Sequence, residues 1–192
     1  MPRLFSGIKI PANIQPELAD LQTGLDGARW IDPGDFHVTL RFAGDIDGNQ
    51  ADEFSGFLSN IHFTPFEITL QTMGSFGGNR PRAVWIGIKN CQDLIDLHHA
   101  HEMAAQHAGL KPESRKFVPH ITLARLRNIS PAETARYLEE KGLAKLRPFT
   151  VSKTILFSAR PGGGGGPYKV EETYPASGDY DDETYDESYN GD

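Results

Sequence analysis

The chain has 192 residues, enough for one domain with a real core or for two small lobes that share one. Its single cysteine, Cys91, excludes an intramolecular disulfide and a four-cysteine zinc site. No run approaches 18 apolar residues and no apolar stretch follows a basic start, so we expect a cytoplasmic protein with neither a membrane span nor a secretion signal.

The net charge of −7 is unevenly distributed. Residues 177–192 contain seven of the 26 acidic residues and no Lys or Arg, which leaves 19 acidic and 19 basic residues in the rest of the chain. A neutral body of this kind can gather basic residues in one cleft and bind a polyanion there.

The hydrophobic period predicts eleven elements, with strands where apolar residues alternate and helices where they recur every three or four positions. In chain order these are a strand at 4–10, a helix at 14–26, a strand at 36–42, a helix at 49–60, strands at 66–70 and 83–88, a helix at 92–108, a strand at 119–125, a helix at 131–141 and strands at 149–157 and 168–173. Glycine-rich loops are expected at 73–81 and 162–166.

This order predicts an α+β protein with internal pseudo-symmetry. Neighbouring strands such as 66–70 and 83–88 suggest antiparallel pairing, and the strands 36–42 and 119–125 each precede a helix and further strands. We expect one bilobed domain over residues 1–176. The rest, 177–192, is expected to be a disordered acidic tail with three tyrosines, either solubilising or imitating a nucleic-acid strand in the cleft.

The same short motif occurs in two of the predicted strands. His37-Val38-Thr39-Leu40 returns 83 positions later as His120-Ile121-Thr122-Leu123. On a strand, His and Thr at positions i and i+2 lie on one face, about 6.6 Å apart, while the aliphatic residues point into a core. One copy is weak support for a function, but two copies in strand-like contexts predict a site formed by the pair.

Two histidines facing each other can act as general base and general acid, because an imidazole titrates near working pH. This division suits in-line displacement at phosphorus and requires no metal or other cofactor. The hydroxyls of Thr39 and Thr122 and the guanidinium of Arg125 can donate hydrogen bonds to phosphate oxygens.

Residues around both motifs resemble the 2H phosphoesterase superfamily, and within it the RNA 2′,3′-cyclic phosphodiesterases that are also described as 2′-5′ RNA ligases. The resemblance covers about residues 3–175. Its most specific stretches are Phe36-His37-Val38-Thr39-Leu40-Arg41-Phe42-Ala43-Gly44, Pro81-Arg82-Ala83-Val84-Trp85-Ile86-Gly87 and Phe117-Val118-Pro119-His120-Ile121-Thr122-Leu123-Ala124-Arg125. It implies two lobes, each an antiparallel sheet with flanking helices, facing across a central cleft.

The resemblance also implies a reaction and a substrate. A 2′,3′-cyclic phosphate at an RNA end would be hydrolysed to a 2′-phosphate, with His37 as proton donor and His120 as proton acceptor. Ligation, and action on small cyclic nucleotides or ADP-ribose cyclic phosphate, remain open. We expect a monomer with no membrane partner.

Two alternatives compete with this interpretation. The chain could be a nucleotide- or RNA-binding module without turnover, although both histidines and both threonines are intact. His98 and His101 could hold a metal, but their spacing fits a solvated or partly packed helix face better. We interpret Arg82 and Lys116 as ordinary surface charges outside the site.

Overall fold

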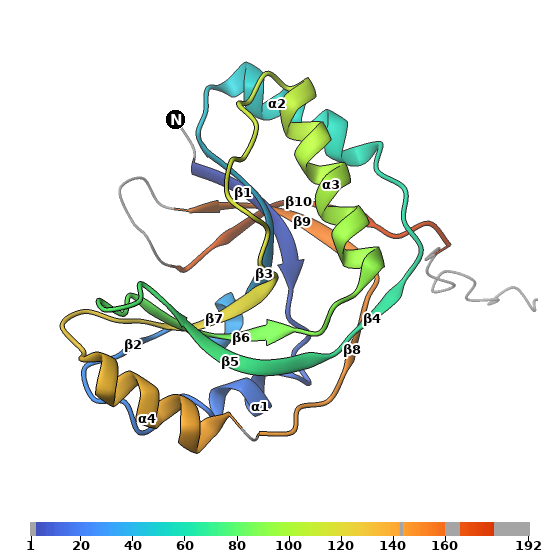
Figure 1. Cartoon of the computed structure of the whole chain (residues 1–192). Helices are drawn as coiled ribbons and strands as arrows, with labels where there is room; N and C mark the ends of the chain where they lie inside the picture. Colours follow the sequence, from blue (N-terminus) through green and yellow to red (C-terminus); the bar gives the residue numbers. More distant parts are fainter. Residues whose placement is uncertain (1–2, 143, 160–165, 179–192) are drawn as a thin grey trace, which may run out of the picture.

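The computed structural model describes residues 3–142, 144–159 and 166–178 (Figure 1). The helices are α1 (Gln15–Ala19), α2 (Gly48–Ser59), α3 (Gln92–His107) and α4 (Pro131–Lys141), with a 3-10 turn at Pro33–Asp35. The strands are β1 (Arg3–Lys9), β2 (Arg29–Trp30), β3 (His37–Asp45), β4 (Phe66–Ile68), β5 (Leu70–Phe76), β6 (Ala83–Ile88), β7 (His120–Arg125), β8 (Phe149–Val151), β9 (Lys153–Ala159) and β10 (Lys169–Pro175).

Eight strands form one antiparallel sheet in the order β10-β9-β1-β3-β7-β6-β5, with β2 paired to β7. The centre of this sheet is the contact between β3 and β7, the two strands that carry the His-x-Thr motifs. A separate two-stranded sheet pairs β4 with β8. The α+β class and the two halves with antiparallel sheets are therefore confirmed, and the two half-sheets meet at the motif strands.

The pseudo-symmetry follows from two successive units of the same order. Apart from the two-residue β2, the 3-10 turn and the final β10, the first unit is β1-α1-β3-α2-β4-β5 and the second is β6-α3-β7-α4-β8-β9. Around the sheet centre β3 corresponds to β7, β1 to β6 and β9 to β5, so each unit gives its last strand to the other half. Each half of the sheet is therefore built from strands of both units.

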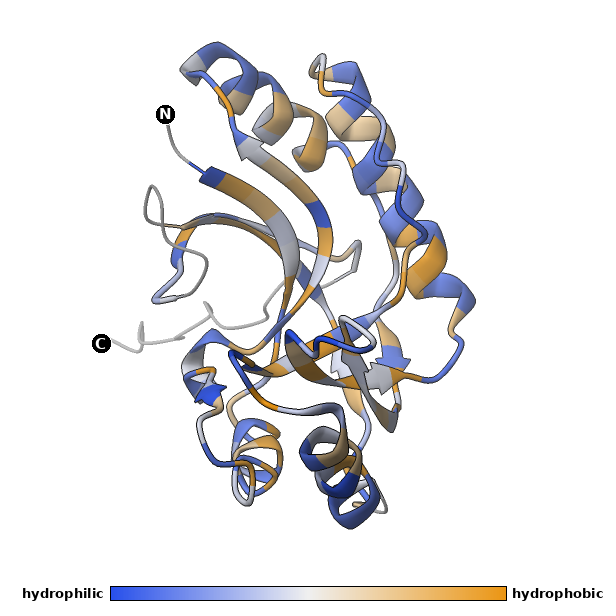
Figure 2. Cartoon of the chain, turned by 60° about the vertical axis from the view of Figure 1, so that its left-hand side comes forward, coloured by the Kyte–Doolittle hydropathy of each residue, from blue (hydrophilic) through white to orange (hydrophobic). Residues whose placement is uncertain are grey.

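Each half of the sheet is also covered by one helix from each unit. Helices α2 and α3 lie over the half that contains β1, while α1 and α4 lie beside the half that contains β5 and β6 (Figure 1). Hydrophobic residues run through the strands and the inner faces of the helices, and hydrophilic residues dominate the outer faces (Figure 2). On the motif strands themselves, Val38, Ile121 and Leu123 are completely buried in the core.

Helix α4 begins as its sequence predicts. The Ser130 hydroxyl accepts a hydrogen bond from the Glu133 backbone amide, and the Glu133 carboxylate accepts one from the Ser130 amide. This capping box satisfies two amides that the first helical turn leaves without partners.

Four predicted boundaries are wrong. The strand expected at 66–70 divides at Thr69, with β4 paired to β8 in the small sheet and β5 paired to β6 in the large one. The helix expected at 14–26 ends at Ala19, and Gly24 has φ = +83°; turns keep Leu21 and Leu25 buried instead. The loop expected at 73–81 starts later, because β5 continues to Phe76. The strand expected at 149–157 divides at Ser152, where the chain passes from one sheet to the other.

Two expectations fall outside the described residues. These are most of the glycine run at 162–166 and the acidic tail from residue 179 onward. Among the helices of the described part, none is long and apolar enough to cross a membrane.

Candidate active site

The motif strands place their polar side chains on one face of the sheet centre. Val38 on β3 is paired with Ile121 on β7 in antiparallel register, and both are fully buried on the opposite face. Side chains alternate along a strand, so the flanking motif residues share the other face. These are the partly exposed His37, Thr39, His120 and Thr122. The register sets each histidine opposite the threonine of the other motif.

Each imidazole uses one ring nitrogen to hold its orientation. His37 Nδ1 donates to the Asp35 carbonyl oxygen at 2.7 Å, and His120 Nδ1 donates to the Val118 carbonyl oxygen at 2.6 Å. A carbonyl can only accept, so the proton is on Nδ1 and the neutral ring has its lone pair on Nε2. Among the described residues, neither Nε2 has a hydrogen-bond partner, so both are available for proton transfer.

Aromatic rings surround both imidazoles in a pseudo-symmetric way. Phe5 and Tyr168 lie with their ring centroids 4.9 and 5.0 Å from that of His37. Phe76 and Trp85 lie 4.8 and 5.8 Å from His120. These rings fix the imidazoles sterically and remove water from them.

Desolvation is also the main influence on the pKa of each imidazole. Burial lowers the pKa of His37 below its ordinary value, and it does so against the opposing effect of the Asp35 carbonyl. Burial likewise lowers the pKa of His120, against the hydrogen bond to Val118. The positive charges of His120 and Arg125 add a smaller lowering at His37.

Two adjoining cavities open on this face and share Thr39 and Phe42. The smaller, of about 250 Å³, contains His37. It is lined by Arg3, Phe5, His37, Thr39, Phe42, Arg125, Ala159 and Tyr168. The larger, of about 650 Å³, contains His120. Arg125 ends β7 with an exposed side chain, so the structure brings it from the second motif into the cavity of the first histidine.

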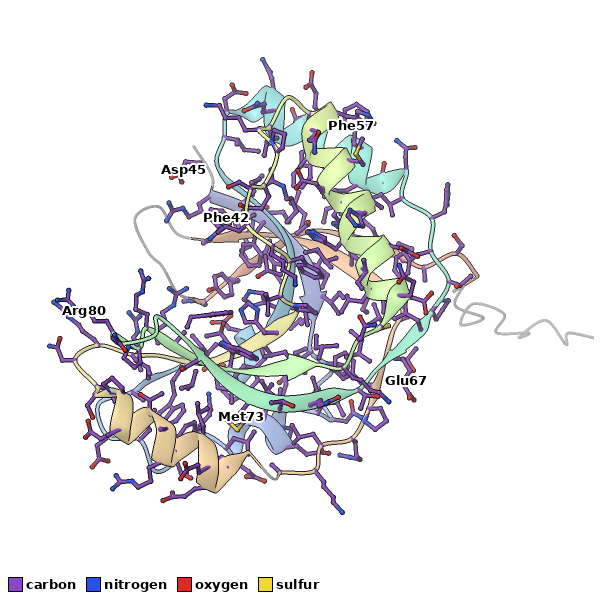
Figure 3. The ribbon with its side chains drawn as sticks, viewed as in Figure 1. Phe42, Asp45, Phe57, Glu67, Met73 and Arg80 are labelled. Atoms are coloured by element: carbon purple, nitrogen blue, oxygen red, sulfur yellow. The ribbon has the colours of Figure 1, made fainter. Side chains whose placement is uncertain are left out.

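Several residues that line the cavities, such as Arg3 and Phe42, could not be predicted as site residues from a single sequence. Arg3 forms an ion pair with Asp45 at 3.2 Å, and its guanidinium carbon lies 5.7 Å from the ring centroid of Phe42. Phe42 and Asp45 lie on the half that carries β3, and Arg80 lies at the tip of the β5–β6 hairpin on the other half (Figure 3).

Arg82 and Lys116, predicted from the sequence to be surface charges outside the site, are both exposed, and both line the cavity that contains His120. They come from two different segments, and only the fold brings them together.

The structure gives protein partners to both candidate metal ligands on α3. His98 Nδ1 donates to the Leu40 carbonyl oxygen at 2.9 Å, and His101 Nδ1 lies 2.8 Å from the Ser6 hydroxyl. His101 is completely buried, so the helix face is packed and not solvated at this position. Within residues 3–142, 144–159 and 166–178, no three His, Cys, Asp or Glu side chains are grouped so that they could hold a metal ion.

Comparison with known proteins identifies relatives over most of the chain. It is 31% identical over 130 residues to the RNA 2′,3′-cyclic phosphodiesterase of Methanocaldococcus jannaschii, and the aligned region covers 66% of this chain and 73% of the relative. It is 29% identical over 168 residues to the protein of the same name from Archaeoglobus fulgidus, and this alignment covers 83% of this chain and 94% of the relative. The crystal structure of E. coli LigT complexed with 3′-AMP matches 92% of this chain and 99% of LigT, with a TM-score of 0.75 and 24% identity.

The family model described as LigT like Phosphoesterase matches two consecutive stretches, residues 8–85 and 86–168. The division falls within β6, close to the boundary between the two structural units. The resemblance inferred from the two motifs is confirmed. The chain belongs to the LigT-like phosphoesterase family.

Proposed function

We propose that this protein is an RNA 2′,3′-cyclic phosphodiesterase that hydrolyses a terminal cyclic phosphate to a 2′-phosphate by metal-independent catalysis with two histidines. One observation carries the proposal: two imidazoles, each with Nδ1 bonded to a carbonyl and Nε2 free, share one face with two threonines. The curated relatives with that activity support the substrate class.

The proposed reaction is an in-line displacement at phosphorus. Nε2 of His120 accepts a proton from a water molecule, whose oxygen forms a bond to phosphorus. The bond between phosphorus and the 3′ oxygen breaks, and Nε2–H of His37 gives its proton to that oxygen. The products are a 2′-phosphate and a free 3′-hydroxyl. The near symmetry of the site permits either direction of proton flow, and the assignment of the two roles follows the family resemblance.

Thr39, Thr122 and Arg125 are proposed to bind the phosphoryl oxygens. The two hydroxyls lie two residues after the histidines on the same face, and Arg125 adds a positive charge to the cavity that contains His37. Negative charge increases on these oxygens in the transition state, where donors that are already in place stabilise it most.

Product analysis tests the proposal directly. An oligoribonucleotide ending in a 2′,3′-cyclic phosphate is incubated with the protein in excess EDTA, and the ends are resolved by mass and by sensitivity to a 3′-specific phosphatase. We expect conversion to the 2′-phosphate alone. Binding of the oligonucleotide without any conversion would contradict the proposal and support a binding module.

A further inference from the structure

The sheet alone does not fix the separation of the two histidines. Along their described length, β3 and β7 share one register pair, Val38–Ile121. Beyond it β3 diverges and β2 takes its place beside β7, with Trp30 paired to Ala124. A single pair constrains the angle between the two strands less than a full ladder would, so a second connection between them can help to set the distance between His37 and His120.

Helix α3 provides that second connection through His98. Its Nδ1 donates to the carbonyl oxygen of Leu40, which lies between Thr39 and Arg41 on β3. Its ring stacks on Phe117, with the centroids 3.8 Å apart and the planes at 4°. Phe117 precedes Val118, the residue whose carbonyl orients His120. One imidazole therefore contacts both segments that hold the active-site histidines.

One turn further along α3, Glu102 makes a parallel pair of contacts. Its carboxylate forms an ion pair with Arg41, whose side chain is 6% exposed, and accepts a hydrogen bond from the Glu113 amide at 3.1 Å. Arg41 Nη2 also donates to the Lys111 carbonyl oxygen at 2.5 Å. These contacts tie β3 to the segment that leads into β7, so the segment is anchored near its start by Glu102 and near its end by His98.

We propose that His98 is a positioning residue that holds His37 and His120 at their working separation, by its hydrogen bond to β3 and its ring stack on the segment before β7. The hypothesis rests on the proposed function for its kinetic consequence, but its geometric consequence can be measured without substrate. Misplacement of a catalytic group by about 1 Å can cost on the order of 100-fold in rate, while substrate binding need not change.

The two contacts of His98 can be removed separately. His98→Asn keeps a donor near the Nδ1 position but has no ring to stack. His98→Phe keeps the stack on Phe117 and loses the donor, and His98→Ala loses both. His99→Ala is the matched control, since His99 is the next residue of the same helix and is exposed.

Steady-state kinetics on RNA ending in a 2′,3′-cyclic phosphate should separate positioning from binding. We expect His98→Ala to lower kcat roughly 10- to 100-fold with KM within about twofold of wild type. His98→Asn and His98→Phe should each recover part of the loss, and His99→Ala should behave as wild type. A folded His98→Ala with wild-type kcat, or one with raised KM and unchanged kcat, would overturn the proposal.

Proton NMR of the ring N–H of His120 gives an independent result. The hydrogen bond to Val118 should protect this proton from exchange in wild type and in His99→Ala, and the signal should weaken or vanish in His98→Ala. If His98→Ala does not fold, the comparison of His98→Asn and His98→Phe decides, and an undiminished signal in both contradicts the proposal. A wild-type protein without turnover would refute the proposed function, and the NMR comparison would still decide on positioning.

Discussion

At the scale of single residues, the site depends on two imidazoles whose protonation is set by burial. The lowered pKa of His120 favours the neutral base, whereas the lowered pKa of His37 opposes the protonated acid. In kcat/KM, which reports the free enzyme, both limbs of the bell-shaped pH profile should lie below the ordinary histidine pKa of about 6.5.

Substrate should shift one of these limbs. A bound phosphate anion favours the charged form of His37, so the basic limb of kcat should lie at higher pH than the basic limb of kcat/KM. Initial rates from pH 4.5 to 8.5, at saturating and at low substrate, check this expectation. A basic limb above pH 7.5 in kcat/KM would contradict the role of burial.

The phosphate donors can be tested by replacements of similar shape. Thr39→Val, Thr122→Val and Arg125→Ala each remove a donor that we place at phosphate oxygens, and such donors contribute about 2.7–4 kcal/mol, or 10²–10³ in kcat. The controls Thr150→Val and Arg136→Ala change exposed residues on β8 and α4. If kcat and KM of all three site variants match those of the controls, the proposed phosphate-binding face is wrong.

At the scale of elements, β5 and β6 support His120 through one close approach. Gly74 on β5 is paired with Trp85 on β6, and a Cβ atom at Gly74 would lie 2.4 Å from the indole. The absence of a side chain lets the indole lie across β5 and pack near His120.

Gly74→Ala should therefore disturb both stability and catalysis. Moving the indole or the strand is expected to cost about 1–3 kcal/mol of unfolding free energy, the range for overpacking, and to lower kcat by moving Trp85 against His120. Gly56→Ala is the control, because this exposed glycine of α2 has open space around it. It should leave kcat unchanged and raise the melting temperature slightly. A Gly74→Ala protein with wild-type stability and kcat would contradict the close contact.

The elements also show what the sequence can predict. Periodicity and capping place α3, α4 and the second motif strand within one residue, because these signals are local. The first motif strand begins within one residue of its prediction but continues three residues further, to Asp45. The break at Ser152 reflects the pairing of β8 with the distant strand β4, and beyond the early end of α1 the Leu21 carbonyl accepts a hydrogen bond from the distant Tyr137 hydroxyl. A local pattern does not contain that information.

The same limit applies to the site. His37, Thr39, His120 and Thr122 are predictable because each motif is contiguous and repeated. The positions of Arg82, Lys116 and Phe42 around the cavities follow from sheet order, which brings segments far apart in the chain together. The two contacts of His98 are with residues distant in sequence, so its pattern on the helix predicted only a solvated or partly packed face, with a metal site as the alternative.

At the scale of the whole molecule, a buried histidine should make stability depend on pH. His101 is completely buried beside Ser6, and burial, followed by the charge of His98, lowers its pKa to about 3. Between pH 6.5 and 3 the unfolded chain binds this proton and the folded chain does not. His101 therefore makes the folded state lose up to ~1.4 kcal/mol for each pH unit of acidification in that range.

A variant isolates this effect from other titrating groups. His101→Asn keeps a donor for the Ser6 hydroxyl and cannot take up the proton. Denaturant unfolding at pH 7 and pH 4.5 should show a smaller loss of unfolding free energy for the variant than for wild type. His99→Asn, on the exposed side of α3, is the control and should lose as much as wild type. Equal losses in wild type and His101→Asn would rule out the contribution of His101.

The exchanged strands of the two units give the whole molecule one composite site, to which each unit contributes one histidine. If the two imidazoles act together as base and acid, removing both should cost little more than removing one. The direct measurement is the single-turnover rate on RNA ending in a 2′,3′-cyclic phosphate, in excess EDTA, for wild type, His37→Ala, His120→Ala and the double variant. We predict full activity for wild type, losses of roughly 10²–10⁴ for each single variant and a similar loss for the double variant. A single variant that retains the wild-type rate, or a wild type that requires a divalent ion, would contradict metal-independent catalysis by His37 and His120.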